Sequence, residues 1–301
     1  MTPPIVFALD GGERLAQALG PALGAEAGVL LQRQFPDGET YLRIDSDVTE
    51  RDVILVCGLE RPDAKLPPLL FAADTLRELG ARGVGLIAPY LAYMRQDTRF
   101  HPGEAVTSRI FAAVLSRHLD WLVTVDPHLH RHHALAEIYR IPSQLVHAAP
   151  LMASWIRRNV ARPVIVGPDL ESEQWVAQVA AGADAPFLVC QKQRSGDREV
   201  DISIPNAGAF LGRQAVLVDD IASSGRTLAV AARTLAVAAR QLKALGFAPP
   251  DCVVVHALFA GDAAQVLGEH VARIVSTNTV AHASNAIDMT PAIAQAVRAL
   301  L

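Results

Sequence analysis

The amino-acid sequence predicts an α/β protein of two domains, each built on a parallel sheet that helices cover on both faces. Its 301 residues are enough for two cores of the usual ~150 residues. Hydrophobic residues make up 51% of the chain but aromatic residues only 5%, so the cores must be aliphatic and rich in alanine. Short β-branched runs also alternate with amphipathic segments rich in Ala, Leu and Arg, which is typical of parallel sheets.

The predicted strands recur along almost the whole chain. They are residues 5–9 (IVFAL), 53–59 (VILVCGL), 84–90 (VGLIAPY), 121–126 (WLVTVD), 163–169 (PVIVGPD), 185–191 (APFLVCQ), 215–221 (AVLVDDI), 252–258 (CVVVHAL) and 273–279 (RIVSTNT). Because no Gly/Ser stretch, charged tail or low-complexity linker separates the halves, the boundary must be tight. We place it near Ala148, which gives predicted domains of residues 1–148 and 149–301.

Charge and hydropathy favour a small-molecule partner. The net charge of -4 and the pI of about 6.2 provide no broad basic surface, so we expect no nucleic-acid partner. Residues 1–12 hold only a short apolar run and no basic stretch, so we expect no export signal. The longest apolar segment, residues 84–94, is well short of the ~20 residues that span a bilayer, and we expect a soluble cytoplasmic protein with no membrane partner.

The cysteines carry no redox or zinc signature. Cys57, Cys190 and Cys252 each lie in or beside a predicted strand, and no two form a CxxC pair. We therefore expect small buried hydrophobic side chains in a reducing compartment.

In two of the predicted strands an acidic residue stands where the apolar run stops, at Asp126 and Asp219. In open parallel sheets, ligands bind beyond the carboxyl ends of the strands, so both aspartates are placed to face a site. The alternative for either one is a helix N-cap.

The strongest local signal follows the predicted strand at residues 215–221. Hydroxyls and a glycine stand where a helix begins, and free N–H groups there favour an anion. The phosphate-binding residues predicted from this pattern are Ser223, Ser224, Gly225, Arg226 and Thr227. The carboxylates of Asp219 and Asp220 suit two ribose hydroxyls, so the segment predicts a ribose 5-phosphate site. An ordinary capped loop would explain the serines but not two consecutive acids.

This loop resembles the phosphoribosyl-pyrophosphate loop of type I phosphoribosyltransferases. Further motifs occur in the order found in ribose-phosphate pyrophosphokinases, also called PRPP synthetases, and the resemblance covers nearly the whole chain. They are FPDGE (35–39), RQD (95–97) continuing to FHPGE (100–104), VDPH (125–128), GPD (167–169), KQR (192–194) and TNT (277–279). The resemblance implies two similar three-layer α/β/α domains with a phosphoribosyltransferase-like fold. It also implies pyrophosphoryl transfer from Mg-ATP to ribose 5-phosphate.

The resemblance places ATP between neighbouring subunits of a homo-oligomer. Phe35 would stack on adenine, and Asp37 and Glu39 would accept hydrogen bonds from its amino group or from the ribose. Arg95 and Gln96 would hold the triphosphate, with Asp97 in the same segment. Without the other motifs, a core phenylalanine followed by a turn would be the simpler interpretation.

His128 and Asp169 match the family's metal-associated positions. Mg²⁺ prefers oxygen ligands and retains several waters, so Asp169 is expected to act mostly through water. The nearby His128, His130, His132 and His133 form a less favoured zinc hypothesis, because no cysteine or closely spaced carboxylate completes a tetrahedral set.

Lys192 and Arg194 match the catalytic positions of the family. They begin a polar stretch that could close as a lid and stabilise the charge that grows during transfer. The alternative is a solvated surface loop with incidental charges.

One segment departs from the family. Residues 170–175 (LESEQW) replace the small residues, often Ala-Gly-Gly, that usually follow Pro-Asp, and their two acids would repel an anion. Two other functions therefore stay open. One is a phosphoribosyltransferase that consumes phosphoribosyl pyrophosphate, and the other is a catalytically silent subunit of a synthetase.

A direct repeat follows the phosphate loop: residues 227–233 and 234–240 both read TLAVAAR. Seven residues make almost two helical turns, so the apolar face keeps its direction. We predict one uninterrupted helix from about residue 226 to 245, with the surplus turns displaced toward residues 246–250.

Overall fold

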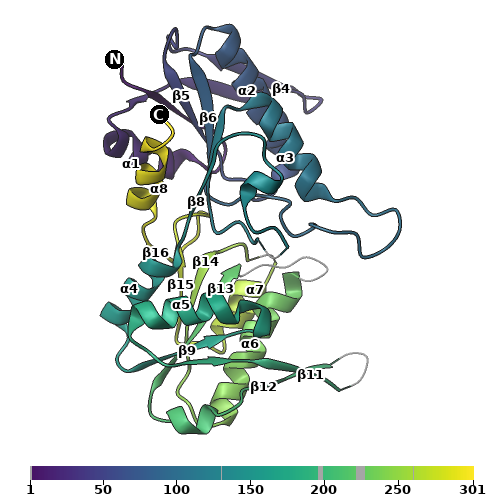
Figure 1. The fold of residues 1–301 in the computed structure, drawn as a ribbon, viewed down its shortest axis with the longest axis vertical. Coiled ribbons are helices and arrows are strands. Elements are labelled where there is room, and N and C mark those ends of the chain that lie inside the picture. Colours follow the sequence, from purple (N-terminus) through teal and green to yellow (C-terminus); the bar gives the residue numbers. More distant parts are fainter. Residues whose placement is uncertain (1, 130, 196–198, 222–227, 260) are drawn as a thin grey trace. The chain divides into compact units, whose positions relative to one another are not determined.

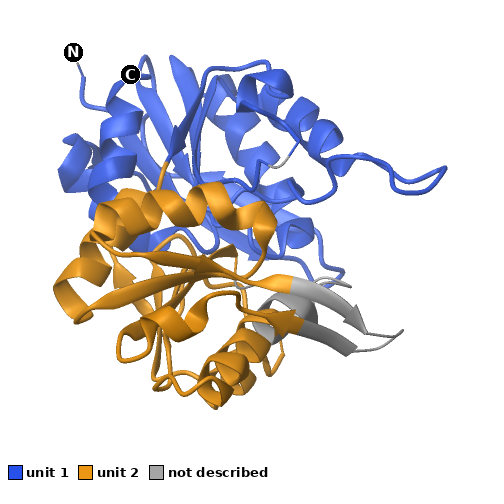
Figure 2. Cartoon of the chain, turned by 60° about the horizontal axis from the view of Figure 1, so that its bottom comes forward, with its two compact units in different colours: residues 1–146, 290–301 blue, residues 147–289 orange. Residues whose placement is uncertain are grey.

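A computed structural model describes residues 2–129, 131–195, 199–221, 228–259 and 261–301; for residues 192–195, 199–201 and 228–233 the backbone alone is described. The chain divides into two units (Figure 2). Unit 1 comprises Met1–Val146 and Thr290–Leu301, and unit 2 comprises His147–Met289.

Unit 1 is built on a sheet of parallel strands (Figure 1). In order across the sheet, the strands described are β2 (Glu26–Ala27), β1 (Ile5–Ala8), β5 (Asp52–Val56), β6 (Gly83–Ala88), β7 (Trp121–Val125) and β8 (Ser143–Val146). Its helices in the described ranges are α1 (Glu13–Leu23), α2 (Leu66–Glu78), α3 (Thr107–His118) and α8 (Thr290–Arg298), with short 3-10 helices η1 (Pro62–Ala64) and η2 (Leu135–Glu137).

Unit 2 repeats this plan with a second parallel sheet. Its described strands, in order across the sheet, are β10 (Phe187–Val189), β9 (Pro163–Gly167), β13 (Gln214–Ile221), β14 (Asp251–His256), β15 (Arg273–Thr277) and β16 (Asn285–Ile287). Its described helices are α4 (Ala149–Asn159), α5 (Glu173–Ala183), α6 (Leu228–Ala244) and α7 (Ala263–Gly268), with η3 (Leu170–Ser172) and η4 (Ala207–Phe210). The predicted α/β fold with two similar parallel-sheet domains is confirmed.

Each unit also carries an antiparallel hairpin between its second and third sheet strands along the chain. The hairpin of unit 1 pairs β3 (Leu30–Gln34) with β4 (Thr40–Ile44), and that of unit 2 pairs β11 (Gln191–Ser195) with β12 (Glu199–Ser203). Because a hairpin is joined locally, it can stand away from the parallel sheet and still keep its register.

Helices α4 and α8 each pack on the unit other than the one whose last strand they follow. Helix α4 follows the last strand of unit 1 but packs on α5 and β16 of unit 2. Helix α8 follows the last strand of unit 2 but packs on α1, β7 and β8 of unit 1, where Arg298 donates to the carbonyl of Ala22. The units therefore differ from the predicted domains: residues 290–301 belong to unit 1, and unit 2 begins at His147 instead of residue 149.

The central strands are buried along their whole length, as strands covered on both faces must be. Every residue of β7, β9 and β14 is buried. Cys57, Cys190 and Cys252 are buried and free, as predicted. Burial raises the pKa of the Cys57 and Cys190 thiols to about 12, so both stay protonated at neutral pH. In the described part of the chain, no helix is both long enough and apolar enough to cross a bilayer.

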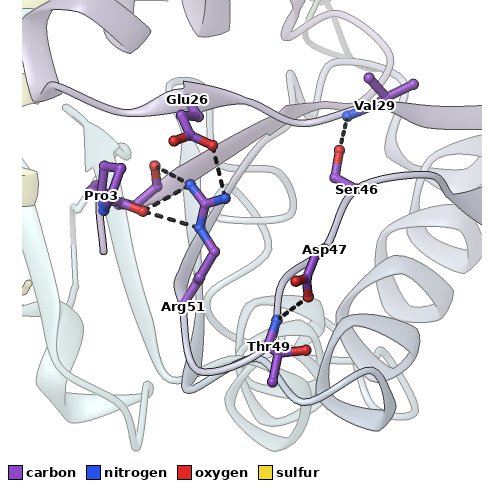
Figure 3. A network of polar contacts seen from close by, with 8 residues as sticks. Pro3, Glu26, Val29, Ser46, Asp47, Thr49 and Arg51 are labelled. Atoms are coloured by element: carbon purple, nitrogen blue, oxygen red, sulfur yellow. Dashed lines mark hydrogen bonds and ion pairs between the residues drawn. The ribbon is translucent and has the colours of Figure 1, made fainter. Parts of the chain in front are cut away.

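The amino ends of three neighbouring strands of unit 1 meet at Arg51. Its guanidinium donates to the Pro3 carbonyl at 2.9 and 3.1 Å and lies 2.9 Å from the Glu26 carboxylate (Figure 3). Because Arg51 directly precedes β5 and these partners lie beside β1 and β2, one buried side chain ties the three strand starts together.

From residue 228 on, the duplicated heptad lies in one continuous helix. Helix α6 runs without a break from Leu228 to Ala244, and Gly246 follows it with a φ of 96°, the left-handed conformation common just after a helix. The Gly246 N–H bonds to the Lys243 carbonyl and the Phe247 N–H to the Leu242 carbonyl. The continuous helix is confirmed for residues 228–244, while residues 226 and 227 lie outside the described residues. The surplus turns do not protrude at this end, because Leu235, Ala238 and Leu242 lie in the core of unit 2.

We predict that Leu235→Ala lowers the free energy of unfolding by about 2–5 kcal/mol, because a fully buried leucine leaves a cavity. Arg240→Ala, on the exposed side of the same copy, should change it by less than ~0.5 kcal/mol. Urea denaturation of both variants measures the difference. Equal, small effects would mean that the second copy does not pack in the core.

Candidate functional site

The carboxyl edge of the second sheet carries the predicted sugar site. Asp219 and Asp220 lie inside β13 and do not follow it, since the strand continues to Ile221. The Asp220 N–H donates to Oδ1 of Asp219 at 3.0 Å. Asp219 is buried and Asp220 is partly exposed. Alternation along the strand thus sends one carboxylate inward and leaves the other open to a ligand.

Asp219 is held in an unfavourable environment for a charge. Burial raises the pKa of its carboxyl well above the ordinary 3.8, and the negative charges of Asp220 and then Asp169 raise it further. Three carboxylates from β13 and from the loop after β9 are therefore close enough to interact. This environment favours the protonated form of Asp219.

Asp169 begins the segment that departs from the family pattern. Its carboxylate accepts from the Ser172 N–H at 3.3 Å, and the Ser172 hydroxyl donates to the Asp169 carbonyl at 2.7 Å. These bonds close the turn of η3, which leads directly into α5. Glu171 and Glu173 are exposed in this stretch. The anion-repelling charges predicted from the sequence thus face solvent beside a closed turn.

Several predicted residues fall outside the described part of the structure. They are Ser223, Ser224, Gly225, Arg226 and Thr227 of the phosphate loop, and the side chains of Lys192 and Arg194. The backbone of Lys192 and Arg194 lies in β11, paired with Ile202 and Val200 of β12. The strand that carries both residues is therefore part of the hairpin of unit 2 (Figure 1).

The predicted adenine-binding residues lie at the tip of the β3–β4 hairpin. The Gly38 N–H bonds to the Phe35 carbonyl at 2.9 Å, and the Phe35 N–H bonds to the Glu39 carbonyl at 2.8 Å. Gly38 has φ 92°, so Pro36, Asp37 and Gly38 form the three-residue loop expected of such a sequence. Asp37 accepts from the Glu39 N–H at 3.1 Å. The ring of Phe35 is not in the core, since 39% of the residue is exposed.

The RQD segment precedes helix α3, and its three side chains differ in their surroundings. Arg95 is exposed. The side-chain oxygen of Gln96 accepts from the Thr107 hydroxyl at 3.0 Å. Asp97 is buried and lies 2.8 Å from a guanidinium nitrogen of Arg131. Of the three, Arg95 is the most exposed.

The turn after β7 holds the predicted metal residue His128. Asp126 (φ 31°) and His128 (φ 57°) both adopt the left-handed backbone conformation that L-residues rarely take. Strain of this kind often accompanies a functional site. His132 bonds to Glu137 at 3.2 Å, and the His133 N–H donates to the same carboxylate at 2.9 Å, while His130 lies outside the described residues. No metal-binding group of three His, Cys, Asp or Glu occurs within the described ranges.

Sequence reasoning missed two residues that hold the RQD segment. Arg131 bonds to Asp97 and stands over the Phe100 ring at 5.4 Å. Tyr93 has φ 61°, and its hydroxyl donates to Asp63. Each contact joins residues about 30 positions apart, so no local pattern signals it. Only the proximity of Tyr93 to the RQD motif could have pointed to it.

Comparison with known proteins places this arrangement in a family. A model described as the N-terminal domain of ribose phosphate pyrophosphokinase matches residues 4–118, and a phosphoribosyl transferase domain model matches residues 134–291. The chain belongs to the ribose-phosphate pyrophosphokinase family.

Individual relatives extend along the whole chain. A ribose-phosphate pyrophosphokinase from Methanopyrus kandleri is 32% identical over 98% of this chain and 99% of its own length. One from Saccharolobus solfataricus is 34% identical over 82% of each. The crystal structure of phosphoribosylpyrophosphate synthetase from Mycobacterium smegmatis superposes with a TM-score of 0.83 at 22% identity, covering 99% of this chain and 98% of that one, which supports the fold.

We predict that Asp219→Asn raises the Tm of this pyrophosphokinase-family protein at pH 7–8 in the absence of ligands. Because the pKa of Asp219 is raised in the folded state, its protonated carboxyl contributes fully to stability below about pH 4. This contribution is lost as the pH rises through the folded-state pKa. The gain in Tm should therefore shrink as the pH falls toward 4.

Exposed Asp184→Asn is the control, because asparagine tolerates the left-handed conformation that Asp184 adopts. Its Tm difference from the unmodified protein should not follow this pH course. An Asp219→Asn variant that is less stable at every pH would contradict the destabilising role of the buried charge.

Proposed function

We propose that this chain transfers the pyrophosphoryl group of Mg-ATP to the C1 hydroxyl of ribose 5-phosphate, giving phosphoribosyl pyrophosphate and AMP for nucleotide biosynthesis. The full-length match to ribose-phosphate pyrophosphokinases carries this proposal. In the reaction, the C1 oxygen bonds to the β-phosphorus of ATP. The bond between that phosphorus and the oxygen bridging to the α-phosphorus breaks, and AMP leaves with that oxygen.

Unit 2 supplies the acceptor site in this proposal. Asp220, partly exposed on β13, accepts hydrogen bonds from the ribose hydroxyls, and Asp219 orients it through the bond to its N–H. Residues 223–227 bind the 5-phosphate. Lys192 and Arg194 on the β11–β12 hairpin stabilise the charge on the transferring group. The partial exposure of Asp220 at this edge of the sheet supports the assignment, because a carboxylate accepts hydrogen bonds from neutral hydroxyls.

Unit 1 supplies the nucleotide-binding residues. The exposed Phe35 ring offers a stacking surface for adenine, and Glu39 stands beside it after the turn. Arg95 binds the triphosphate, and Asp97 acts through Arg131 by fixing the loop that carries His128. We also propose a cytoplasmic homo-oligomer in which neighbouring subunits share the ATP site.

Asp169 in unit 2 and His128 in unit 1 are each proposed as a residue that would hold Mg²⁺. Burial is the main cause of the raised pKa of Asp219, and a divalent cation near Asp169 would offset the smaller contribution of the Asp169 charge; carboxylate oxygens with water are ligands that Mg²⁺ accepts. Bound with ATP, Mg²⁺ would shield the negative charge of the phosphates.

The deciding experiment mixes purified protein with Mg-ATP and ribose 5-phosphate and follows the products by ion-exchange chromatography. The proposal expects AMP and phosphoribosyl pyrophosphate in equal amounts. Formation of ADP would exclude pyrophosphoryl transfer. No turnover at any phosphate concentration would favour the silent subunit, and consumption of added phosphoribosyl pyrophosphate with a nucleobase would favour a phosphoribosyltransferase.

We predict that Lys192→Ala or Arg194→Ala lowers kcat by about 100-fold or more, or ~3 kcal/mol of transition-state stabilisation. The affinity for ribose 5-phosphate should stay nearly the same, because both cations act on the charge that develops during transfer. Steady-state kinetics test this, with exposed Lys243→Ala as the control. A raised KM for the sugar with unchanged kcat would move both residues to ground-state binding.

A further inference from the structure

The exposed face of the β3–β4 hairpin carries a stack of three planar side chains. The guanidinium carbon of Arg33 lies 4.3 Å from the centre of the Tyr41 ring and 4.6 Å from the centre of the Phe35 ring. The two rings meet edge to face, with centres 6.1 Å apart and planes at 90°. Arg33 therefore contacts both rings at distances that are favourable for cation–π interaction.

The strand register explains why these side chains meet. Arg33 is directly opposite Tyr41, and Phe35 follows Arg33 by two residues, so all three point to one side. On the other side, Leu30, Leu42 and Ile44 are half-buried, and β4 contacts α2. The hairpin thus rests on its apolar face and turns the stack outward.

The base of the hairpin is fixed. The Val29 N–H donates to the Ser46 hydroxyl at 2.8 Å (Figure 3), and the Asp45 N–H donates to the Val29 carbonyl at 2.9 Å. At the tip, the bonds of Phe35 to Gly38 and Glu39 close the turn. The stack therefore stands on a backbone that is held at both ends.

Arg33 differs from the other arginine on this face. Arg43 pairs with Asp45 at 2.7 Å, whereas no carboxylate pairs with Arg33 among the residues that the structure describes. The stacking contacts of Arg33 are thus the interactions that set its position. A guanidinium over one face of Phe35 restricts the rotamers of an otherwise exposed ring and leaves the remainder of the ring available to a planar ligand.

We propose that Arg33 is a positioning residue for recognition of the nucleotide base, holding Phe35 between the guanidinium and the incoming heterocycle. The inference rests on the proposed stacking of adenine on Phe35. Pre-organising the ring lowers the entropy lost on binding, so the contribution belongs to the base and not to the phosphates. Tyr41 also contacts the Arg33 guanidinium and meets the Phe35 ring edge to face.

The experiment compares Arg33→Ala and Arg33→Lys with Arg43→Ala in the full chain. Calorimetric titration gives the affinity for ATP and for inorganic tripolyphosphate, a probe that has the phosphates without the base. Arg33→Ala should lower the affinity for ATP about tenfold, which is on the order of one stacking contact. The affinity for tripolyphosphate should stay unchanged. Arg33→Lys should lower the affinity for ATP less than Arg33→Ala does, because lysine keeps the charge but lacks the planar guanidinium. Arg43→Ala should bind both as the unmodified chain does.

Kinetics provide a second readout. Arg33→Ala should raise the KM for ATP by a similar factor while kcat and the KM for ribose 5-phosphate stay within about twofold. A merely structural role would change all three together with the Tm.

The outcomes separate this inference from the proposed function. Unchanged ATP affinity in Arg33→Ala, or an equal loss of tripolyphosphate affinity restored by lysine, would overturn the positioning role and leave the reaction untouched. If the unmodified chain binds ATP but makes no product, the proposed function fails and the titrations still decide the role of Arg33. If the unmodified chain does not bind ATP, both fail.

Discussion

Parallel pairing of the strands is the constraint on which the rest of the structure depends. Each parallel strand must be followed by a connection that returns to the opposite end of the sheet, so the segments after the strands gather at one edge. In unit 2 this brings Asp169, after β9, close enough to Asp219 of β13 to raise its pKa. In unit 1, the RQD segment lies in the connection that follows β6, and His128 lies in the turn that follows β7. The chemistry of each unit is therefore placed by its sheet.

Two features at these edges of the sheets destabilise the native state. Asp219 is buried with two negative neighbours, and the turn after β7 has two non-glycine residues in the left-handed conformation. Neither feature helps the chain to fold, because a buried charge and a strained backbone both disfavour the native state. The long buried strands beneath them hold these features in place.

Much of this arrangement could be predicted from the sequence. The apolar runs identify the central strands, the motif FPDGE identifies a turn, and the absence of Gly and Pro identifies the continuous helix α6. The short edge strands β8 and β16 were missed because three or four mixed residues show no periodicity. The place of α8 in unit 1 could not be predicted either, since its amphipathic face fits either unit and only the fold selects α1.

The site divides in the same way. Residue types and spacing are enough to propose Asp220, whereas Phe35 and Arg95 are proposed from the resemblance to the family. The bond from Asp97 to Arg131 and the stack around Arg33 are tertiary contacts or depend on the strand register. Through these contacts, Asp97 holds Arg131 and Arg33 holds the Phe35 ring. The sequence is thus enough to propose candidate site residues, and the structure adds the contacts that hold some of them in position.

Attack at the β-phosphorus of ATP can be followed directly with ATP that carries ¹⁸O in the bridge between the α- and β-phosphates. After incubation with ribose 5-phosphate, mass spectrometry locates the label. Transfer of the pyrophosphoryl group predicts that the ¹⁸O leaves with AMP. Label in free pyrophosphate would mean attack at the α-phosphorus, and label in ADP would mean attack at the γ-phosphorus. Either result would contradict a ribose-phosphate pyrophosphokinase reaction for this chain.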